Sequence, residues 1–252
     1  MAGGKQFGFG SGFMTGLRTD AAGIATPRQI GTLQDNALEF SGDMKELYGS
    51  YAYPVDTAVG KRKVSGKSKL ATQQLEMFND LYFGQTLSAG QTQRTIPPGE
   101  AFTPGSSAVS YTVALSGSTP LADQGVFYTA TGIQLTAGST ATGEGVYEFV
   151  ASTGIYNFSS SDIGNGVLVN YDYTIATGHT LTGQNPFMGF SPIFQMTFVD
   201  IFEGNQIEFF FPQCKASRLT FPSRLDDYWY LEFDWMAFAN SAGVTFTIGM
   251  PY

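Results

Sequence analysis

The chain has 252 residues, of which 42% are hydrophobic and 15% are aromatic, but only 13% carry a charge. This apolar content excludes a disordered chain, and the single cysteine excludes a disulfide framework or a cysteine-rich zinc site. The net charge of −8 argues against specific binding of DNA or RNA, because an acidic surface repels phosphates.

The charge is unevenly distributed along the chain. The 120 residues from Thr95 to Cys214 contain no Lys or Arg and nine Asp or Glu. Soluble sheets commonly protect their exposed edges with charged residues, Lys above all. The absence of Lys from the most strand-rich part of the chain therefore predicts that its edges are covered by other segments or by other copies.

Residues 1–30 are rich in Gly and contain scattered aromatic residues, among them Phe7, Phe9 and Phe13. We interpret this segment as an extended N-terminal arm whose aromatic side chains contact a neighbouring subunit. The alternative is an unordered terminus. Residues 1–16 lack the continuous apolar run of a signal peptide, and nothing resembles a membrane-spanning helix. We therefore expect synthesis in the cytoplasm and no membrane partner.

Two segments with alternating side chains, 35–43 and 59–69, predict an antiparallel hairpin. Acidic side chains share one face of the first segment, and basic side chains share one face of the second. These side chains are Asp35, Glu39 and Asp43, and Lys61, Lys63, Lys67 and Lys69. If the segments pair, the lysines lie opposite the carboxylates on a solvated face of the sheet.

The residues between these two segments, 44–58, predict a long loop. Tyr48, Tyr51 and Tyr53 lie in it, followed by Pro54. We expect these tyrosines to form contacts between subunits.

One amphipathic helix is predicted at about 72–83, because Leu75, Phe78 and Tyr82 recur at helical spacing. Thr72 is the expected N-cap and Gly84 the expected stop. Short apolar runs separated by Gly, Ser, Pro or Asn account for the rest of the chain. The expected fold class is mainly β, a sandwich or partial barrel with one flanking helix.

Two segments resemble nucleotide-binding motifs but lack the required spacing or context. Five residues, rather than four, separate Gly60 from Gly66 in the segment Gly60–Ser68, and that segment alternates like a strand. The cluster Gly8-Phe-Gly10-Ser-Gly12 has neither a strand before it nor a helix after it. We expect no bound nucleotide.

The candidate catalytic residues are isolated from the partners they would need. His179 is the only histidine, expected in a solvated turn, and no Gly-x-Ser-x-Gly motif accompanies it. Cys214 is expected to be a buried strand thiol. Asp226–Asp227 and Glu232 with Asp234 would suit a glycosidase or a Ca²⁺ site, but a solvated sheet face explains them equally well. We expect no catalytic residue, no cofactor and no metal.

Several short segments spread over residues 30–240 share one family's pattern. They include Gly31-Thr-Leu-Gln-Asp35, Asp43-Met-Lys-Glu-Leu-Tyr-Gly49, Asn79-Asp-Leu-Tyr-Phe-Gly84, Val169-Asn-Tyr-Asp-Tyr173 and Met188-Gly-Phe-Ser-Pro192. Through them the chain resembles tail tube proteins of long-tailed (siphophage-type) bacteriophages. The resemblance implies a β-sandwich with one flanking helix that forms hexameric rings, each subunit adding strands to a ring-shaped barrel. It also implies a virion location.

In such a tube the rings stack, and DNA passes through the lumen without sequence-specific binding. The implied partners are other copies of the chain, the tape measure protein, the tail terminator and the distal tail protein. We expect the hairpin of 35–43 and 59–69 to line the lumen, and secondarily Gln206 and Glu208. We expect residues 31–252 to form the tube-like domain. Within it, 95–178 is either an insertion, such as an outer immunoglobulin-like subdomain, or a set of integral core strands.

Two other functions fit parts of the sequence. The first is another non-enzymatic virion component, such as a capsid decoration or a head–tail connector. The second is a secreted carbohydrate-binding module, for which Tyr228, Trp229 and Tyr230 would form an aromatic platform.

Overall fold

The computed structural model of the chain describes residues 10, 12–20, 25–30, 33–72, 74–106, 109–114, 119–223, 225–226 and 228–250. The predicted contacts of Phe7 and Phe9 lie outside these residues. The fold is mainly β, as predicted, and the described strands do not close into a barrel. The chain divides into two compact units, Met1–Thr86 with Leu181–Tyr252, and Leu87–Thr180. The segment 95–178 lies inside the second unit.

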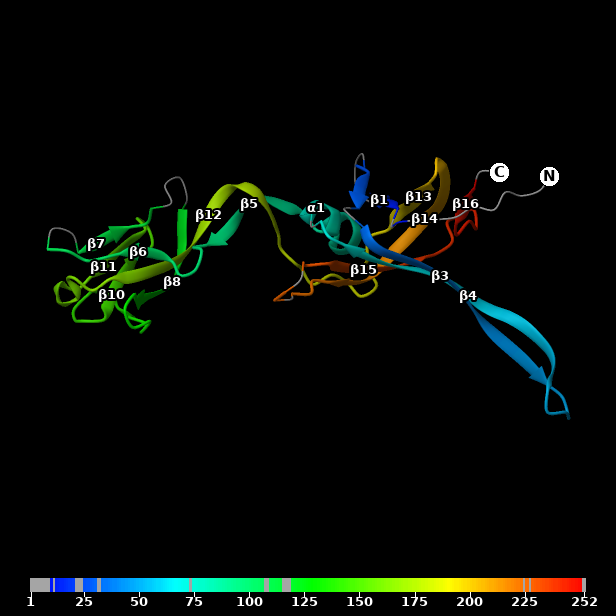
Figure 1. Cartoon of the computed structure of the whole chain (residues 1–252), viewed down its shortest axis with the longest axis horizontal. Coiled ribbons are helices and arrows are strands. Elements are labelled where there is room, and N and C mark those ends of the chain that lie inside the picture. The colour runs from blue at the N-terminus through cyan, green and yellow to red at the C-terminus, as the bar shows by residue number, and fades with distance from the viewer. Residues whose placement is uncertain are drawn as a thin grey trace. The chain divides into compact units, whose positions relative to one another are not determined.

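The first unit is built on one antiparallel sheet and a short helical segment (Figure 1). Its strands are β1 (Phe13–Arg18), β2 (Arg28–Ile30), β3 (Leu33–Tyr48), β4 (Pro54–Leu70), β13 (Phe194–Phe202), β14 (Asn205–Thr220), β15 (Leu231–Ala237) and β16 (Thr247–Gly249). Seven strands follow the order β2-β1-β13-β14-β15-β4-β3, and β16 pairs with β14. The sheet therefore ends at β2 on one side and at β3 on the other.

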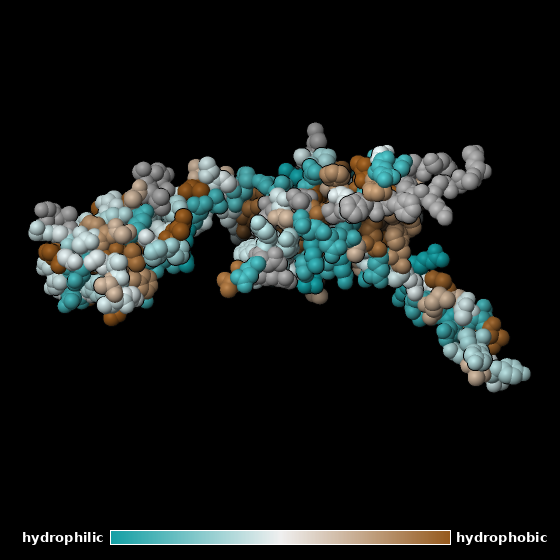
Figure 2. All heavy atoms as spheres, viewed as in Figure 1, coloured by the Kyte–Doolittle hydropathy of each residue, from teal (hydrophilic) through white to brown (hydrophobic). Residues whose placement is uncertain are grey.

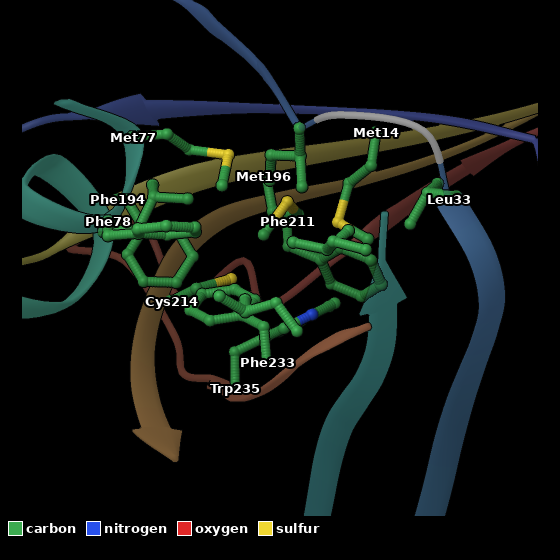
Figure 3. Packing of buried hydrophobic residues seen from close by; sticks show 14 of the residues in the cluster. Met14, Leu33, Met77, Phe78, Phe194, Met196, Phe211, Cys214, Phe233 and Trp235 are labelled. Atoms are coloured by element: carbon green, nitrogen blue, oxygen red, sulfur yellow. The ribbon is translucent and has the colours of Figure 1, made fainter. Parts of the chain in front are cut away.

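This sheet curls around its own core. Phe194 on β13 contacts Phe233 on β15, with ring centroids 6.0 Å apart, although β14 lies between the two strands. The pairing of β14 with β15 contains a register shift, an irregularity that typically bends a strand. The core side chains include Met14, Leu33, Met77, Phe78, Phe194, Met196, Phe211, Cys214, Phe233 and Trp235 (Figure 3).

The helical segment begins later than predicted. It consists of α1 (Leu75–Phe78) and a π-helical turn, η1 (Asn79–Phe83). The prediction of Thr72 as N-cap is wrong, because Gln74, with an extended backbone, precedes the first helical residue. The segment contributes Met77, Phe78 and Leu81 to the core of the first unit.

The predicted stop at Gly84 is confirmed. Its φ of 65° lies in the left-handed region that favours glycine, and its N–H donates to the Asn79 carbonyl oxygen at 2.6 Å. The buried Asn79 side chain in turn binds both backbone groups of Gln85, at 2.8 and 2.6 Å. These contacts direct the chain away from the helix.

The predicted hairpin is confirmed, with Asp35 opposite Lys69 and Ser41 opposite Lys63. It is much longer than predicted, because β3 continues to Tyr48 and β4 begins at Pro54. The prediction of a long loop at 44–58 is wrong: the backbone ladder continues beyond the core although bulges interrupt the side-chain alternation. We call residues 39–63, all of them exposed, the arm; it runs away from the rest of the first unit (Figure 1).

The second unit contains two four-stranded sheets. Its elements are β5 (Leu87–Arg94), β6 (Glu100–Phe102), β7 (Ser110–Thr112), β8 (Thr119–Tyr128), β9 (Thr136–Ala137), β10 (Val146–Val150), β11 (Ile155–Phe158), the 3₁₀ turn η2 (Ser160–Asp162) and β12 (Val167–Leu181). One sheet has the order β7-β11-β10-β9; in the other, β12 pairs with β5, β6 and β8. Phe102 and Phe158 meet between the sheets, with ring centroids 5.7 Å apart. The unit is therefore a small sandwich.

Carboxylates between these two sheets accept hydrogen bonds from tyrosines. Tyr147 and Tyr156, on β10 and β11, both donate to Asp123 on β8. Tyr111 on β7 donates to Glu100 on β6 at 2.6 Å. Part of the negative charge of the Lys-free stretch is thus used to join the sheets, which the sequence did not predict.

The stability of the second unit is expected to fall at alkaline pH. Burial and the neighbouring carboxylate raise the pKa of Tyr147 and of Tyr156. Burial and Asp162 likewise raise the pKa of Tyr128 to about 12. Because the folded state holds the Tyr128 proton more tightly, the stabilisation from Tyr128 is complete below about pH 10 and is lost as the pH rises through about 12. Thermal unfolding followed by tyrosinate absorbance would measure this loss. A melting temperature that stays constant across that range would contradict it.

Candidate assembly interface

The arm carries large apolar side chains that remain exposed to solvent. They are Phe40, Met44, Leu47, Tyr48, Tyr51, Tyr53, Val55 and Val59, each between 46 and 83% exposed. Apolar patches lie among polar residues along the arm in the space-filling view (Figure 2). An isolated two-stranded hairpin is at best marginally stable in water, and an apolar surface of this extent typically marks an interaction site. The arm is therefore the candidate interface.

The sequence predicted part of this surface. Tyr48, Tyr51 and Tyr53 were expected at subunit contacts, and all three are exposed on the arm. The sequence-based prediction missed Val55, because it lies in the predicted loop 44–58. It also missed Val59, because that residue begins the predicted strand 59–69. A side-chain alternation that continued through these residues in register with residues 40–48 would have revealed them. Bulges in the hairpin interrupt that alternation.

A groove of about 800 Å³ lies where the arm joins the sheet. Phe40, Met44 and Val59 line it from the arm, and Phe238 and Phe246 line it from the segment after β15. The rings of Phe40 and Phe246 meet edge to face at 5.0 Å. The base of the arm is thus packed against its own chain, whereas the tip is not.

The charged face of the hairpin extends further than predicted. Lys69 lies between Asp35 on β3, with Nζ 3.9 Å from Oδ2, and Glu232 on β15. Lys67 lies opposite Asp234 on β15. The carboxylates opposite these lysines therefore come mainly from β15 and not from β3 alone.

Arg218 on β14 continues this pattern. Its guanidinium lies 3.3 Å from a Glu232 oxygen and 4.0 Å from an Asp234 oxygen. The carboxylates considered for a glycosidase or a Ca²⁺ site thus have a cationic neighbour. Positive and negative side chains alternate across β3, β4, β15 and β14.

The structure does not bring four of the other predicted lumen residues to this face. Gln206 and Glu208 lie at the opposite end of β14, where its neighbours are β13 and β16. Asp43 and Lys61 lie on the arm, and Asp43 forms an ion pair of 2.8 Å with Lys45. Glu39 and Lys63, by contrast, belong to the charged face, because the register from Asp35 to Gly42 is unbroken; they lie where the arm begins.

Phe13, predicted at a subunit contact, begins β1 and is 57% exposed. Cys214 is buried as predicted, and burial raises the pKa of its thiol. The expectation of a turn around His179 is wrong, because this residue extends β12, where it is exposed. The segment Gly60–Ser68 is part of β4, in agreement with its alternation. Asp226 is exposed.

Among the residues that the structure describes, no group of three or more His, Cys, Asp or Glu is placed to hold a metal ion. No helix within the same residues is long and apolar enough to cross a membrane. In comparisons with known proteins, no family model and no curated protein matched this chain.

Proposed function

We propose that this protein is a structural virion protein that assembles into stacked rings and forms the tail tube of a long-tailed bacteriophage, a conduit for DNA delivery. The observation that carries the proposal is the arm. Its apolar side chains extend beyond the core of their own chain and are 46 to 83% exposed. Such a hairpin needs a covering surface to be stable in water.

Other copies of the chain are the partner that best fits this need. The sheet of the first unit ends at β2 and β3, whose outer backbone groups offer hydrogen bonds to further strands. Pairing between copies at these ends would close a ring of strands and remove both edges. The family resemblance indicates six copies in a ring.

The alternating charges on β3, β4, β15 and β14 agree with a surface past which DNA moves. Two lysines of this face have a carboxylate opposite them: Lys67 has Asp234 and Lys69 has Asp35. Lysines that are already paired release fewer counterions on contact with phosphates, so that DNA gains little affinity. DNA then passes through the tube without being held. The other proposed partners are the tape measure, terminator and distal tail proteins.

Electron microscopy of the purified protein tests this proposal. We expect rings or tubes with a central channel wide enough for duplex DNA, and a sedimentation coefficient that rises with protein concentration. A protein that remains monomeric at high concentration would contradict the proposal. Binding to preformed capsids without self-stacking would favour a decoration or connector protein instead.

A further inference from the structure

Two loops of the first unit expose apolar side chains almost completely. Between β12 and β13, Phe187 is 95% exposed and Met188 is 103% exposed. Between β14 and β15, Leu225 is 98% exposed and Tyr228 is 80% exposed. Isolated apolar residues are common on protein surfaces, but four at this exposure on two loops indicate a contact site.

Both loops lie against the same helical segment. Phe221, at the start of the second loop, packs on Phe78 of α1 at 5.5 Å with the rings perpendicular. At the end of the helical segment, a Cβ added to Gly84 would lie 3.2 Å from the ring of Phe190 and 2.9 Å from Pro192. We call the surface made by Phe187, Met188, Phe190, Phe221, Leu225, Tyr228 and Trp229 the loop surface.

The arm of a given copy is too far from its own loop surface to cover it. The helical segment begins shortly after β4 ends at Leu70, whereas the arm tip precedes Pro54, where β4 begins. The 17 residues of β4 span about 55 Å at roughly 3.3 Å per residue. The tip and the loop surface therefore lie at opposite ends of a long strand.

The two surfaces match in size and in chemistry. Eight large apolar residues on the arm and seven on the loop surface are at least 46% exposed. Because these side chains are only partly exposed, we count roughly 100 Å² of accessible area for each, less than the full area of a large side chain. Either surface then offers about 700–800 Å². One side of a specific interface buries about 800 Å². Tyrosines on the arm also suit Met188, because thioethers pack favourably against aromatic rings.

We propose that the arm of one copy docks on the loop surface of the next copy. This inference rests on the proposed self-assembly and names the two surfaces that meet. A contact between two different surfaces continues from copy to copy, as rings or stacks require. Reciprocal docking of two arms in each other's basal grooves would instead stop at a pair. The groove is also partly occupied by the contact between Phe40 and Phe246.

Cysteine cross-linking tests this contact in the full chain. The double variant Tyr51→Cys/Met188→Cys, treated with a short thiol-specific cross-linker, is expected to give a ladder of covalent oligomers. A mixture of the two single variants is expected to give dimers at most. The native Cys214 is buried, so it does not compete for the reagent. Tyr53→Cys/Phe187→Cys is a second pair in case the first variant folds poorly.

The control is the double variant Tyr51→Cys/Phe246→Cys, whose second cysteine lies in the basal groove. No ladder is expected from this variant. Electron microscopy of each variant separates the two proposals. Rings or tubes without a ladder from either arm–loop pair would overturn the docking but not the proposed function. Cross-linking of the groove pair alone, to covalent dimers or beyond, would overturn the docking in favour of the groove. A parent protein that never assembles would overturn both.

Discussion

Replacing Leu47, Tyr51 and Tyr53 together by Ser is expected to abolish assembly while leaving the subunit folded. The three side chains lie at the arm tip and are 64, 83 and 83% exposed, so they contribute nothing to the core. Truncating an apolar residue that anchors an interface costs about 1–2 kcal/mol. Three such losses raise the concentration needed for assembly by about 100-fold or more.

The measurement is sedimentation velocity over a range of protein concentrations, together with thermal unfolding of the same samples. The matched control replaces Ile96 and Ile133 by Ser, because these residues of the second unit are 85 and 63% exposed but lie outside both surfaces. We expect this control to assemble like the parent. Equal assembly by the arm variant would show that the arm is not the interface.

Replacing Trp235 by Ala is expected to reduce the free energy of unfolding by about 3–5 kcal/mol, the range for a large aromatic residue removed from a core. Trp235 is fully buried, and its ring packs on Phe211 at 4.9 Å. Its indole also fills the space beside Gly66, where a Cβ would lie only 2.3 Å from the ring. The indole N–H has no hydrogen-bond partner among the described residues, so the loss comes from packing alone.

The chain provides a matched control for this variant. Trp229, the other of its two tryptophans, is 49% exposed on the loop surface. Trp229→Ala is expected to change the free energy of unfolding by less than about 1 kcal/mol. Chemical denaturation of both variants measures the difference. Equal losses would mean that the core does not depend on Trp235.

Regular alternation made much of the fold predictable. In β12, Val167, Val169 and Tyr171 are all buried, as their spacing indicated, because each second residue of a strand faces the same side. The pairing of Asp35 with Lys69 followed in the same way from two segments in register. Gly84 was predictable as a helix stop because glycine adopts a positive φ at little cost.

The arm was predicted less well, because local signals do not report on contacts beyond the core. Residues 44–58 lack a clean alternation, and strand pairing there depends on the backbone ladder rather than on burial. Lys67 and Lys69 were expected to face carboxylates of the first segment of the hairpin. The sequence did not indicate that Glu232 and Asp234, more than 160 residues later, would lie across from them.

The sequence by itself determined a mainly β protein, a hairpin with charged residues on one face, and a 120-residue stretch that lacks Lys and Arg. These properties depend on neighbouring residues and on composition, which can be read along the chain. Only the tertiary structure decided that two carboxylates of that stretch, Glu100 and Asp123, accept hydrogen bonds from tyrosines between two sheets. It also decided that the apolar arm and the loop surface lie at opposite ends of β4. Both results depend on which distant segments pack together, and that choice is made by burial of the whole core rather than by any local pattern.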